Sequence, residues 1–194
     1  MKEHLIVSIR ITIALLVITC GIYPALVWGI GQLVFNHRAN GSLIVQGGRV
    51  IGSELIGQNF SGDRFFHPRP SAAGIDGYDG TSSGGTNFGP TSKKLRDAVA
   101  AAVSSYKEAR SAAGIPADAV TASASGLDPH ISPDNALAQA PRVARANHIP
   151  LEVVQALVQA RIEGRFIGIF GEPRVNVLLL NLDLLKGVVP RSSG

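Results

Sequence analysis

The longest hydrophobic stretch of the chain lies near its N-terminus. Between Ile11 and Val34 no residue is charged, and the polar residues, such as Thr12, Thr19 and Gln32, are not ionisable. A helix over this stretch would be about 36 Å long, enough to cross a hydrocarbon core of about 30 Å with some tilt. The pattern predicts one transmembrane helix over residues 11–34, which has no group that would conduct ions on its own.

Two kinds of cleaved signal compete with an uncleaved membrane anchor. A secretory signal has an apolar region of about 7–15 residues and a small-x-small cleavage site, and neither fits this longer stretch. A lipoprotein signal would need small residues before Cys20, where the chain has Val17–Thr19. We therefore expect an anchor, with this lone cysteine in lipid as a small apolar residue. Charge leaves the orientation open, because basic residues flank both ends: Lys2 and Arg10, and Arg38 and Arg49.

A hairpin and a long glycine-rich loop are predicted after the anchor. Ser42–Gln46 and Arg49–Ile56 are apolar-rich runs joined by two glycines, which is typical of a tight β-hairpin. The following stretch, residues 57–92, is dominated by Gly, Ser, Asp and Pro, and loops of this length are usually functional or disordered. Its aromatic residues favour an ordered loop anchored by its own side chains: Phe60, Phe65, Phe66, Tyr78 and Phe88.

Three helices are predicted beyond this loop. The first begins after Ser92 and ends at Gly114, before a small-residue loop over 117–126. The second begins at Ser132-Pro133, with Ser as cap and Pro at the first position, and Pro141 should kink or restart it. The third begins at Pro150 and ends near residue 164.

The C-terminal part predicts a return to strands. Phe166–Phe170 has the pattern of a strand, a turn follows, and Val175–Leu180 fits either a strand or the start of a buried helix. The fold class expected is α+β: a transmembrane helix followed by one small mixed α/β domain. The predicted divisions are an N-terminal segment, the helix, the domain and a frayed tail: residues 1–10, 11–34, 35–187 and 188–194. The Val-Pro-Arg-Ser sequence in the tail is either natural or the remnant of a cleavable tag.

Composition excludes several classes of protein. Charged residues make up 16% of the chain and hydrophobic residues 45%, with a mean hydropathy of +0.21. Disorder needs the opposite balance, and one hydrophobic segment does not make a multi-span transporter. The net charge of +4 comes without a cluster of Lys and Arg interleaved with aromatic residues, so no nucleic-acid partner is expected.

Catalytic and metal-binding constellations are weak in this sequence. The five histidines are scattered, and the closest pairing with a carboxylate is Asp128 with His130. A turn in which the Asp128 side chain accepts a backbone hydrogen bond is the simpler interpretation of that pair. A hydrolase built from Ser125, His130 and Asp128 is an alternative, although the G-x-S-x-G pattern is absent. No metal site is predicted.

Phosphate-binding fingerprints are also missing, apart from one short segment. Neither the phosphate loop nor the dinucleotide fingerprint occurs in the chain. Ser83–Asn87 is rich in glycine and hydroxyl groups, which makes it a possible nucleotide contact, although the same residues are ordinary turn chemistry.

An ordered series of motifs resembles one family. The series comprises ANGSLI at 39–44, IGS at 51–53, LIGQ at 55–58, RPSA at 69–72, SGGTNFGP at 83–90, VTAS at 120–123, GLDPHISP at 126–133, PRVAR at 141–145 and GEPRVN at 171–176. In this order, and over roughly residues 1–186, the chain resembles the C subunit of the bacterial Kdp potassium-transporting P-type ATPase.

The resemblance implies a place in a larger complex. Members of that family are single-span proteins of the bacterial inner membrane, with a cytoplasmic N-terminus and an extracytoplasmic domain. Their partners are a channel-like potassium-translocating subunit, a P-type ATPase subunit and a small single-span stabilising subunit. The C subunit is needed for assembly, and it has been proposed as a catalytic chaperone that raises the ATP affinity of the ATPase subunit. By that match the nucleotide candidates are Ser83, Gly84 and Gly85, while ATP and potassium are otherwise handled by the complex.

Topology favours a structural role for that segment, because ATP is cytoplasmic and an extracytoplasmic loop does not reach it. We expect a non-catalytic accessory subunit, with direct nucleotide binding and an anchored hydrolase as alternatives. The residues expected to shape a partner surface, or else to stabilise loops internally, are Arg69, Pro70, Asp128, His130 and Arg174. The small residues expected to allow close helix packing in the membrane are Gly21, Gly29 and Gly31.

Overall fold

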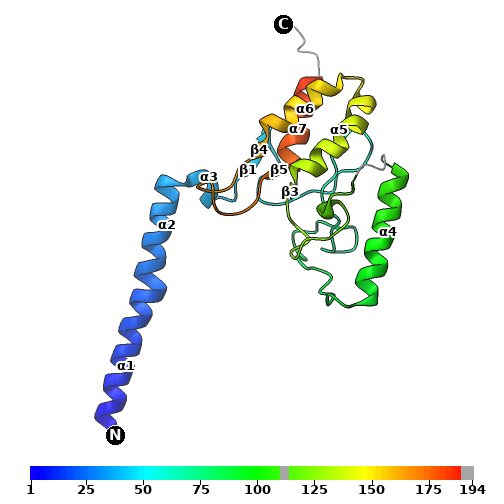
Figure 1. Cartoon of the computed structure of the whole chain (residues 1–194). Coiled ribbons are helices and arrows are strands. Elements are labelled where there is room, and N and C mark those ends of the chain that lie inside the picture. The colour runs from blue at the N-terminus through cyan, green and yellow to red at the C-terminus, as the bar shows by residue number, and fades with distance from the viewer. Residues whose placement is uncertain (110–113, 189–194) are drawn as a thin grey trace, which may run out of the picture. The chain divides into compact units, whose positions relative to one another are not determined.

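A computed structural model describes residues 1–109 and 114–188 of the chain (Figure 1). It divides into two compact units, Met1–Ile51 and Gly52–Gly194. The first contains one long apolar helix, and the second is a mixture of helices and short strands. The fold class is therefore mixed α/β, as the sequence predicts, with a single apolar helix before the mixed unit.

The apolar helix runs from Lys2 to Val34 and is long and apolar enough to cross a membrane. It consists of α1 (Lys2–Leu16), the π-helical turn η1 (Val17–Ile22) and α2 (Tyr23–Val34). Pro24, in the first turn of α2, explains the π-turn, because proline has no N–H and its ring clashes with the carbonyl four residues earlier. At this point the Tyr23 amide donates instead to the Ile18 carbonyl, five residues back.

The two threonines of this helix are satisfied within the helix itself. The Thr12 hydroxyl donates to the Ser8 carbonyl at 2.8 Å, and the Thr19 hydroxyl donates to the Leu15 carbonyl at 2.7 Å. Hydroxyl groups bonded in this way add little cost in an apolar surrounding. The structure thus has the helix predicted over 11–34 and extends it by nine residues toward the N-terminus.

A short helix and a hairpin follow. After α3 (Asn36–Ala39), strands β1 (Leu43–Gln46) and β2 (Arg49–Ser53) form a two-stranded sheet. Gly47 and Gly48 join them with φ values of +58° and +76°, the conformation that a two-residue hairpin turn requires and that glycine adopts at no steric cost. The predicted hairpin is confirmed.

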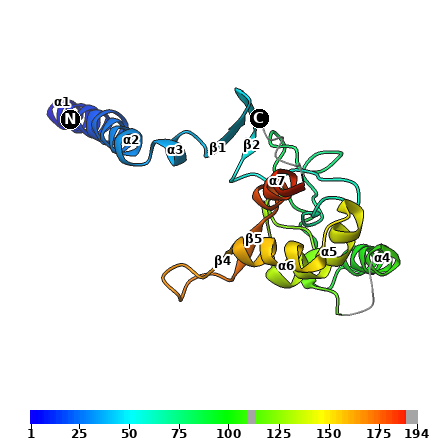
Figure 2. The ribbon, with the colours of Figure 1, turned by 90° about the horizontal axis from the view of Figure 1, so that it is seen from above.

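The second unit is built around a small antiparallel sheet and three helices. The strands are β3 (His130–Ile131), β4 (Ile162–Glu163) and β5 (Arg174–Asn176), in the order β3-β5-β4. Val175 in the central strand pairs with Ile131 on one side and with Ile162 on the other. The helices are α5 (Pro133–Asn147), α6 (Leu151–Ala160) and α7 (Val177–Val188), and α6 packs against both α5 and α7 (Figure 2).

Small and branched residues at helical spacing form the core. Ala136, Ala140 and Val143 lie on one face of α5 and are fully buried, as are Val154 and Val158 of α6. Small alanines allow the helix backbones to approach closely, and the branched valines fill the remaining space. The sheet contributes Ile131 and Val175, and α7 contributes Leu180 and Leu184.

The starts of the predicted helices agree with the structure. Helix α4 (Lys93–Ala109) follows Ser92, and the loop predicted over 117–126 contains only the 3-10 turn η2 (Ala117–Ala119). Ser132 caps α5, because its side chain accepts a hydrogen bond from the Asn135 amide. Helix α5 continues through Pro141 without a restart.

Two predictions in the C-terminal part are wrong. Helix α6 ends at Ala160 rather than near residue 164, because β4 begins at Ile162 to pair with β5. The expected strand Phe166–Phe170 is a tight turn, since Ile167 and Gly168 have positive φ values that reverse the chain. Residues 175–180, left open between strand and helix, contain the end of β5 and the start of α7. The predicted frayed tail lies outside the described residues beyond Val188.

Candidate functional site

The glycine-rich loop over 57–92 is anchored to the helices by one buried aromatic side chain. Phe66 is fully buried in the core, and its backbone is held from both sides by Asn181 of α7. The Phe66 amide donates to Asn181 Oδ1 at 2.8 Å, and Asn181 Nδ2 donates to the Phe66 carbonyl at 3.0 Å. Gln139 of α5 makes the same pair of bonds with the backbone of His67. These bonds fix the direction in which the next residues leave the core.

A second loop, over 120–129, is fastened to the first. The Ser71 hydroxyl donates to the Gly126 carbonyl at 2.7 Å and accepts a hydrogen bond from the Tyr78 amide. Gly126 is buried with φ of +68°, and a Cβ there would lie 2.7 Å from both the Ala73 Cβ and the Gly84 carbonyl oxygen. Only glycine meets both requirements without strain. The two loops therefore form one rigid support.

Arg69 and Asp128 meet where these loops cross. Arg69 Nη1 lies 3.1 Å from Asp128 Oδ2, and the guanidinium also donates to the carbonyls of Thr121 and Ala122. Both side chains are more than two-thirds buried. Asp128 Oδ1 accepts a hydrogen bond from the His130 amide at 3.0 Å, which confirms the turn predicted for this segment. His130 Nδ1 lies 3.4 Å from the same oxygen.

The environment of Asp128 holds its carboxyl in the ionised form. Burial disfavours the charge, but hydrogen bonds from the His130 side chain and backbone, together with the Arg69 charge, outweigh it. The net effect lowers the pKa of Asp128 below its ordinary value of 3.8. At neutral pH the centre of this cluster is thus a fixed ion pair.

An open pocket of about 430 Å³ has this ion pair in its wall. It brings together four residues that the sequence predicts for a partner surface: Arg69, Asp128, His130 and Arg174. Asp118, Ser132 and Glu172 also line it. Arg174 comes from β5, where its Nε donates to Glu163 Oε2 at 2.9 Å on the neighbouring strand. The pocket therefore presents both signs of charge from elements far apart in the sequence.

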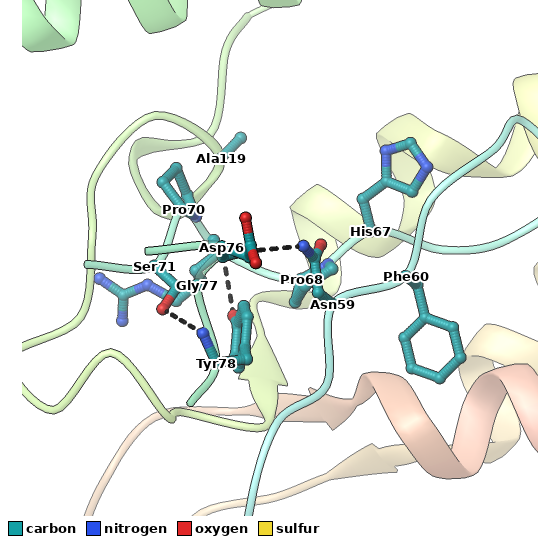
Figure 3. A pocket seen from close by; sticks show the side chains of 11 residues that line it. Asn59, Phe60, His67, Pro68, Pro70, Ser71, Asp76, Gly77, Tyr78 and Ala119 are labelled. Carbon is teal, nitrogen blue, oxygen red and sulfur yellow. Dashed lines mark hydrogen bonds between the residues drawn. The ribbon is translucent and has the colours of Figure 1, made fainter. Parts of the chain in front are cut away.

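Pro70, the fifth predicted residue, lines a neighbouring pocket of about 300 Å³ (Figure 3). Arg69 lines both pockets, so they share one wall. Here the Tyr78 hydroxyl donates to the Arg69 carbonyl at 2.8 Å, and Asn59 Nδ2 donates to the Asp76 carbonyl. Burial, followed by the Asp128 charge, raises the pKa of Tyr78 above its ordinary value of 10.0, so the phenol remains a neutral donor.

The nucleotide candidates Ser83, Gly84 and Gly85 lie against the second loop instead. The Ser83 hydroxyl and the Gly84 amide both donate to the Ser125 carbonyl, at 3.0 and 2.9 Å. A Cβ on Gly85 would lie 2.6 Å from the Ala124 carbonyl oxygen, whereas a Cβ on Gly84 would meet nothing within 4 Å. The Ser83 hydroxyl and the Gly84 amide, two donors that a phosphate would use, therefore already form hydrogen bonds within the chain.

Ser125, the nucleophile of the hydrolase alternative, serves as a turn residue. Its Oγ accepts a hydrogen bond from the Leu127 amide at 3.1 Å, and it does not line the pocket that contains Asp128 and His130. Among residues 1–109 and 114–188, no group of three His, Cys, Asp or Glu side chains is placed to hold a metal ion.

The helix glycines lie on the apolar helix with open surroundings. A Cβ on Gly21 or Gly29 would meet nothing within 4 Å, and one on Gly31 would lie 3.8 Å from the Ala39 Cβ. Gly21 also lines a shallow apolar groove beside the π-turn, together with Cys20 and Ala25. These positions leave room for the backbone of another helix to approach.

Sequence reasoning missed Asp118 and Tyr78. Asp118 accepts hydrogen bonds from the amide and hydroxyl of Ser132 and from Asn135 Nδ2, so it fixes the start of α5 beside the pocket. Its signal in the sequence is a lone carboxylate in an alanine-rich stretch, which is weak. The sequence predicts Tyr78 only as a loop anchor, because its role in holding the Arg69 backbone depends on a tertiary contact.

Comparison with known proteins gives a consistent result. A family model described as K+-transporting ATPase, c chain, matches residues 5–186. The chain is similar to the potassium-transporting ATPase KdpC subunit of Myxococcus xanthus, with 54% identity over 95% of this chain and 88% of the relative. It is also similar to the subunits of that name from Nitratidesulfovibrio vulgaris (50% identity, 91% of each chain) and Mycobacterium tuberculosis (47%, 95% and 98%).

Proposed function

The chain belongs to the KdpC family of K+-transporting ATPase subunits, and on that premise we propose that it is a non-catalytic accessory subunit that assembles and stabilises the complex. Family membership makes it a membrane-associated component of a potassium transporter. The accessory role, the partners and the topology belong to the proposal.

The observation that carries this role is the pocket around Arg69 and Asp128. Its walls come from the two interlocked loops, the start of α5 and strand β5. The Arg69 guanidinium and the Asp128 carboxylate are held by each other and by backbone groups, so little side-chain freedom is lost when a partner covers them. A fixed polar surface of this kind suits recognition of another protein.

In this proposal the chain spans the bacterial inner membrane once, with its N-terminus in the cytoplasm and its mixed α/β domain outside. The apolar helix packs against the channel-like potassium-translocating subunit, and the domain covers the outer face of that subunit. The P-type ATPase subunit and the small single-span subunit complete the complex. ATP and potassium are handled by those partners, and this chain holds no cofactor of its own.

The proposal gives Ser83–Gly85 a structural role rather than a nucleotide contact. The internal bonds to the Ser125 carbonyl support this assignment. The alternatives are a nucleotide-binding chaperone that raises the ATP affinity of the ATPase subunit and direct nucleotide binding. Titration of the detergent-solubilised chain with a fluorescent ATP analogue distinguishes the structural role from both alternatives. Saturable binding would support the alternatives, and the absence of binding would support the structural role.

The experiment that tests the function replaces the helix while keeping the anchor. Residues 11–34 are exchanged for an unrelated apolar span of equal length, and the tagged chain is purified from membranes in mild detergent. We expect the wild-type chain to retain the other subunits and the exchanged chain to lose them. A stable, active complex with the exchanged span would contradict the role of the helix.

Orientation has its own test. A reporter enzyme that is active only outside the cytoplasm is fused after Gly194, and the same reporter fused before Met1 serves as the control. We expect activity from the C-terminal fusion alone. Activity from the N-terminal fusion alone would reverse the proposed topology.

A further inference from the structure

The turn between β4 and β5 carries the most exposed cluster of large apolar side chains in the second unit, within its described residues. Phe166, Ile167, Ile169 and Phe170 are 72%, 73%, 71% and 65% exposed. Residues 166–170 are called the apolar knob below. In Figure 2 the loop that joins β4 to β5 extends away from α5 and α6. Four such side chains expose apolar area on the order of 400 Å², a size that in soluble proteins usually marks a binding site.

The knob has a defined conformation. The Phe166 amide donates to the Phe170 carbonyl at 2.8 Å, and the Gly168 amide donates to the Arg165 carbonyl at 3.0 Å. Gly168 has φ of +75°, which glycine adopts without strain. A closed turn of this kind holds its side chains outward before any partner arrives, so binding costs less conformational entropy.

Charged residues at the base of the knob neutralise each other. Arg165 Nη2 lies 2.7 Å from Glu172 Oε2, and Arg174 Nε lies 2.9 Å from Glu163 Oε2. An apolar centre with a polar rim is the usual anatomy of a protein interface. A lipid-binding loop would instead benefit from unpaired basic residues and from Trp or Tyr, and the knob has neither. The occupant that fits is therefore a protein.

The knob is continuous with the candidate site. Glu172, Pro173 and Arg174, which follow the knob after Gly171, line the pocket that contains Arg69 and Asp128. The polar pocket and the apolar knob thus share an edge formed by these three residues. One partner surface that covers the pocket would reach the base of the knob.

We propose that the apolar knob inserts into an apolar hollow on the extracytoplasmic face of the potassium-translocating subunit, which the domain covers in the proposed function. This inference rests on the proposed function and extends it, because it assigns the apolar anchor of the interface. The polar pocket then fixes the orientation of the two subunits, and burial of the knob contributes most of the affinity.

Photo-crosslinking in the intact complex tests the contact. A photoreactive phenylalanine analogue replaces Phe170, and the same analogue at Ile75, another exposed apolar residue of the second unit, is the matched control. We expect irradiation to join the chain to the potassium-translocating subunit from position 170 and not from position 75. Adducts with lipid alone, or equal yields from the two positions, would overturn the proposal.

A double variant measures how much the knob contributes. Ile167→Ser with Ile169→Ser should leave thermal unfolding of the chain unchanged, because both side chains are exposed, and should reduce the retained partner subunits at least tenfold. Retention equal to wild type would overturn the proposal while leaving the proposed function intact. Failure of the wild-type chain to retain any partner would instead contradict the proposed function.

Discussion

Arg69 and Asp128, which are 59 residues apart in the chain, form an ion pair with 3.1 Å between Nη1 and Oδ2. Each belongs to a loop without regular secondary structure, and the pair joins the two loops at the wall shared by two pockets. The same Asp128 side chain also holds the turn at His130. One carboxylate thus contributes to loop stability and to the chemistry of the surface.

The first prediction concerns Asp128→Asn. The amide keeps an acceptor for the His130 amide but loses the charge that pairs with Arg69, so we expect a loss of about 1 kcal/mol in unfolding free energy at pH 7. Thermal unfolding of the full chain in detergent measures it. In a double-mutant cycle with Arg69→Met the two losses should not add, because each variant breaks the same pair.

This effect depends on pH with a defined sign. The pKa of Asp128 is lower in the folded chain than its ordinary value of 3.8, so its ionised form stabilises the fold above that value. The stabilisation is lost as the pH falls through the lower, folded-state pKa. We expect the advantage of wild type over Asp128→Asn to shrink below about pH 4. A constant difference down to pH 2 would show that the charge is not responsible.

The second prediction separates two adjacent glycines. Gly85→Ala places a Cβ 2.6 Å from the Ala124 carbonyl oxygen, and it should destabilise the chain by about 2 kcal/mol. Gly84→Ala meets nothing within 4 Å and should change stability by less than about 0.5 kcal/mol. Both variants are compared by thermal unfolding and by transport activity of the assembled complex. Loss of activity from Gly84→Ala without loss of stability would favour a ligand contact at this segment.

The third prediction concerns the anchor of the long loop. Asn181→Ala leaves the amide and carbonyl of Phe66 buried without their partners, which should cost about 3 kcal/mol. Asn59→Ala, at an exposed position with one hydrogen bond to the Asp76 carbonyl, is the control and should cost less than about 1 kcal/mol. Equal losses for the two variants in chemical unfolding would show that Phe66 is not the principal anchor.

The fourth prediction distinguishes binding from stability at Arg174. This side chain is about half exposed and its ion pair with Glu163 lies at the surface, so Arg174→Ala should change unfolding by less than about 1 kcal/mol. The same variant should weaken retention of partner subunits, because Arg174 lines the pocket. Glu163→Gln removes the ion pair but not the pocket residue, and we expect it to retain the partners. Equal retention by the two variants would exclude Arg174 from the interface.

Local signals in the sequence were sufficient for much of the fold. The uncharged stretch predicts the apolar helix, the two adjacent glycines predict the hairpin, and the Ser-Pro pair predicts the start of α5. Each of these signals lies within one segment of the chain. The sequence wrongly predicts a strand at the turn 166–170, because its apolar residues resemble those of a buried strand. Nothing local shows that β4 ends at Glu163 to pair with β5, or that the chain reverses at Gly168.

The candidate site is likewise predicted only in part from the sequence. The resemblance supplied Arg69, Asp128, His130 and Arg174, and the structure brings these four into one pocket. Their convergence depends on Phe66 being held by α7 across 115 residues, and on Gly126 fitting beneath Ala73. Such contacts between distant segments leave no periodic pattern in the chain. The exposure of the apolar knob is equally unpredictable from the sequence, because apolar residues in a sequence do not reveal whether they are buried.

In the proposed function this chain holds the transporter together, and the retention of the other subunits during purification is the test of that role. The complete complex is produced with a tag on this chain, purified from membranes in mild detergent, and the subunits are quantified beside a preparation tagged on the ATPase subunit but lacking this chain. We expect stoichiometric retention of the partners in the first preparation and dissociated, inactive subunits in the second. An intact, active complex without this chain would contradict it.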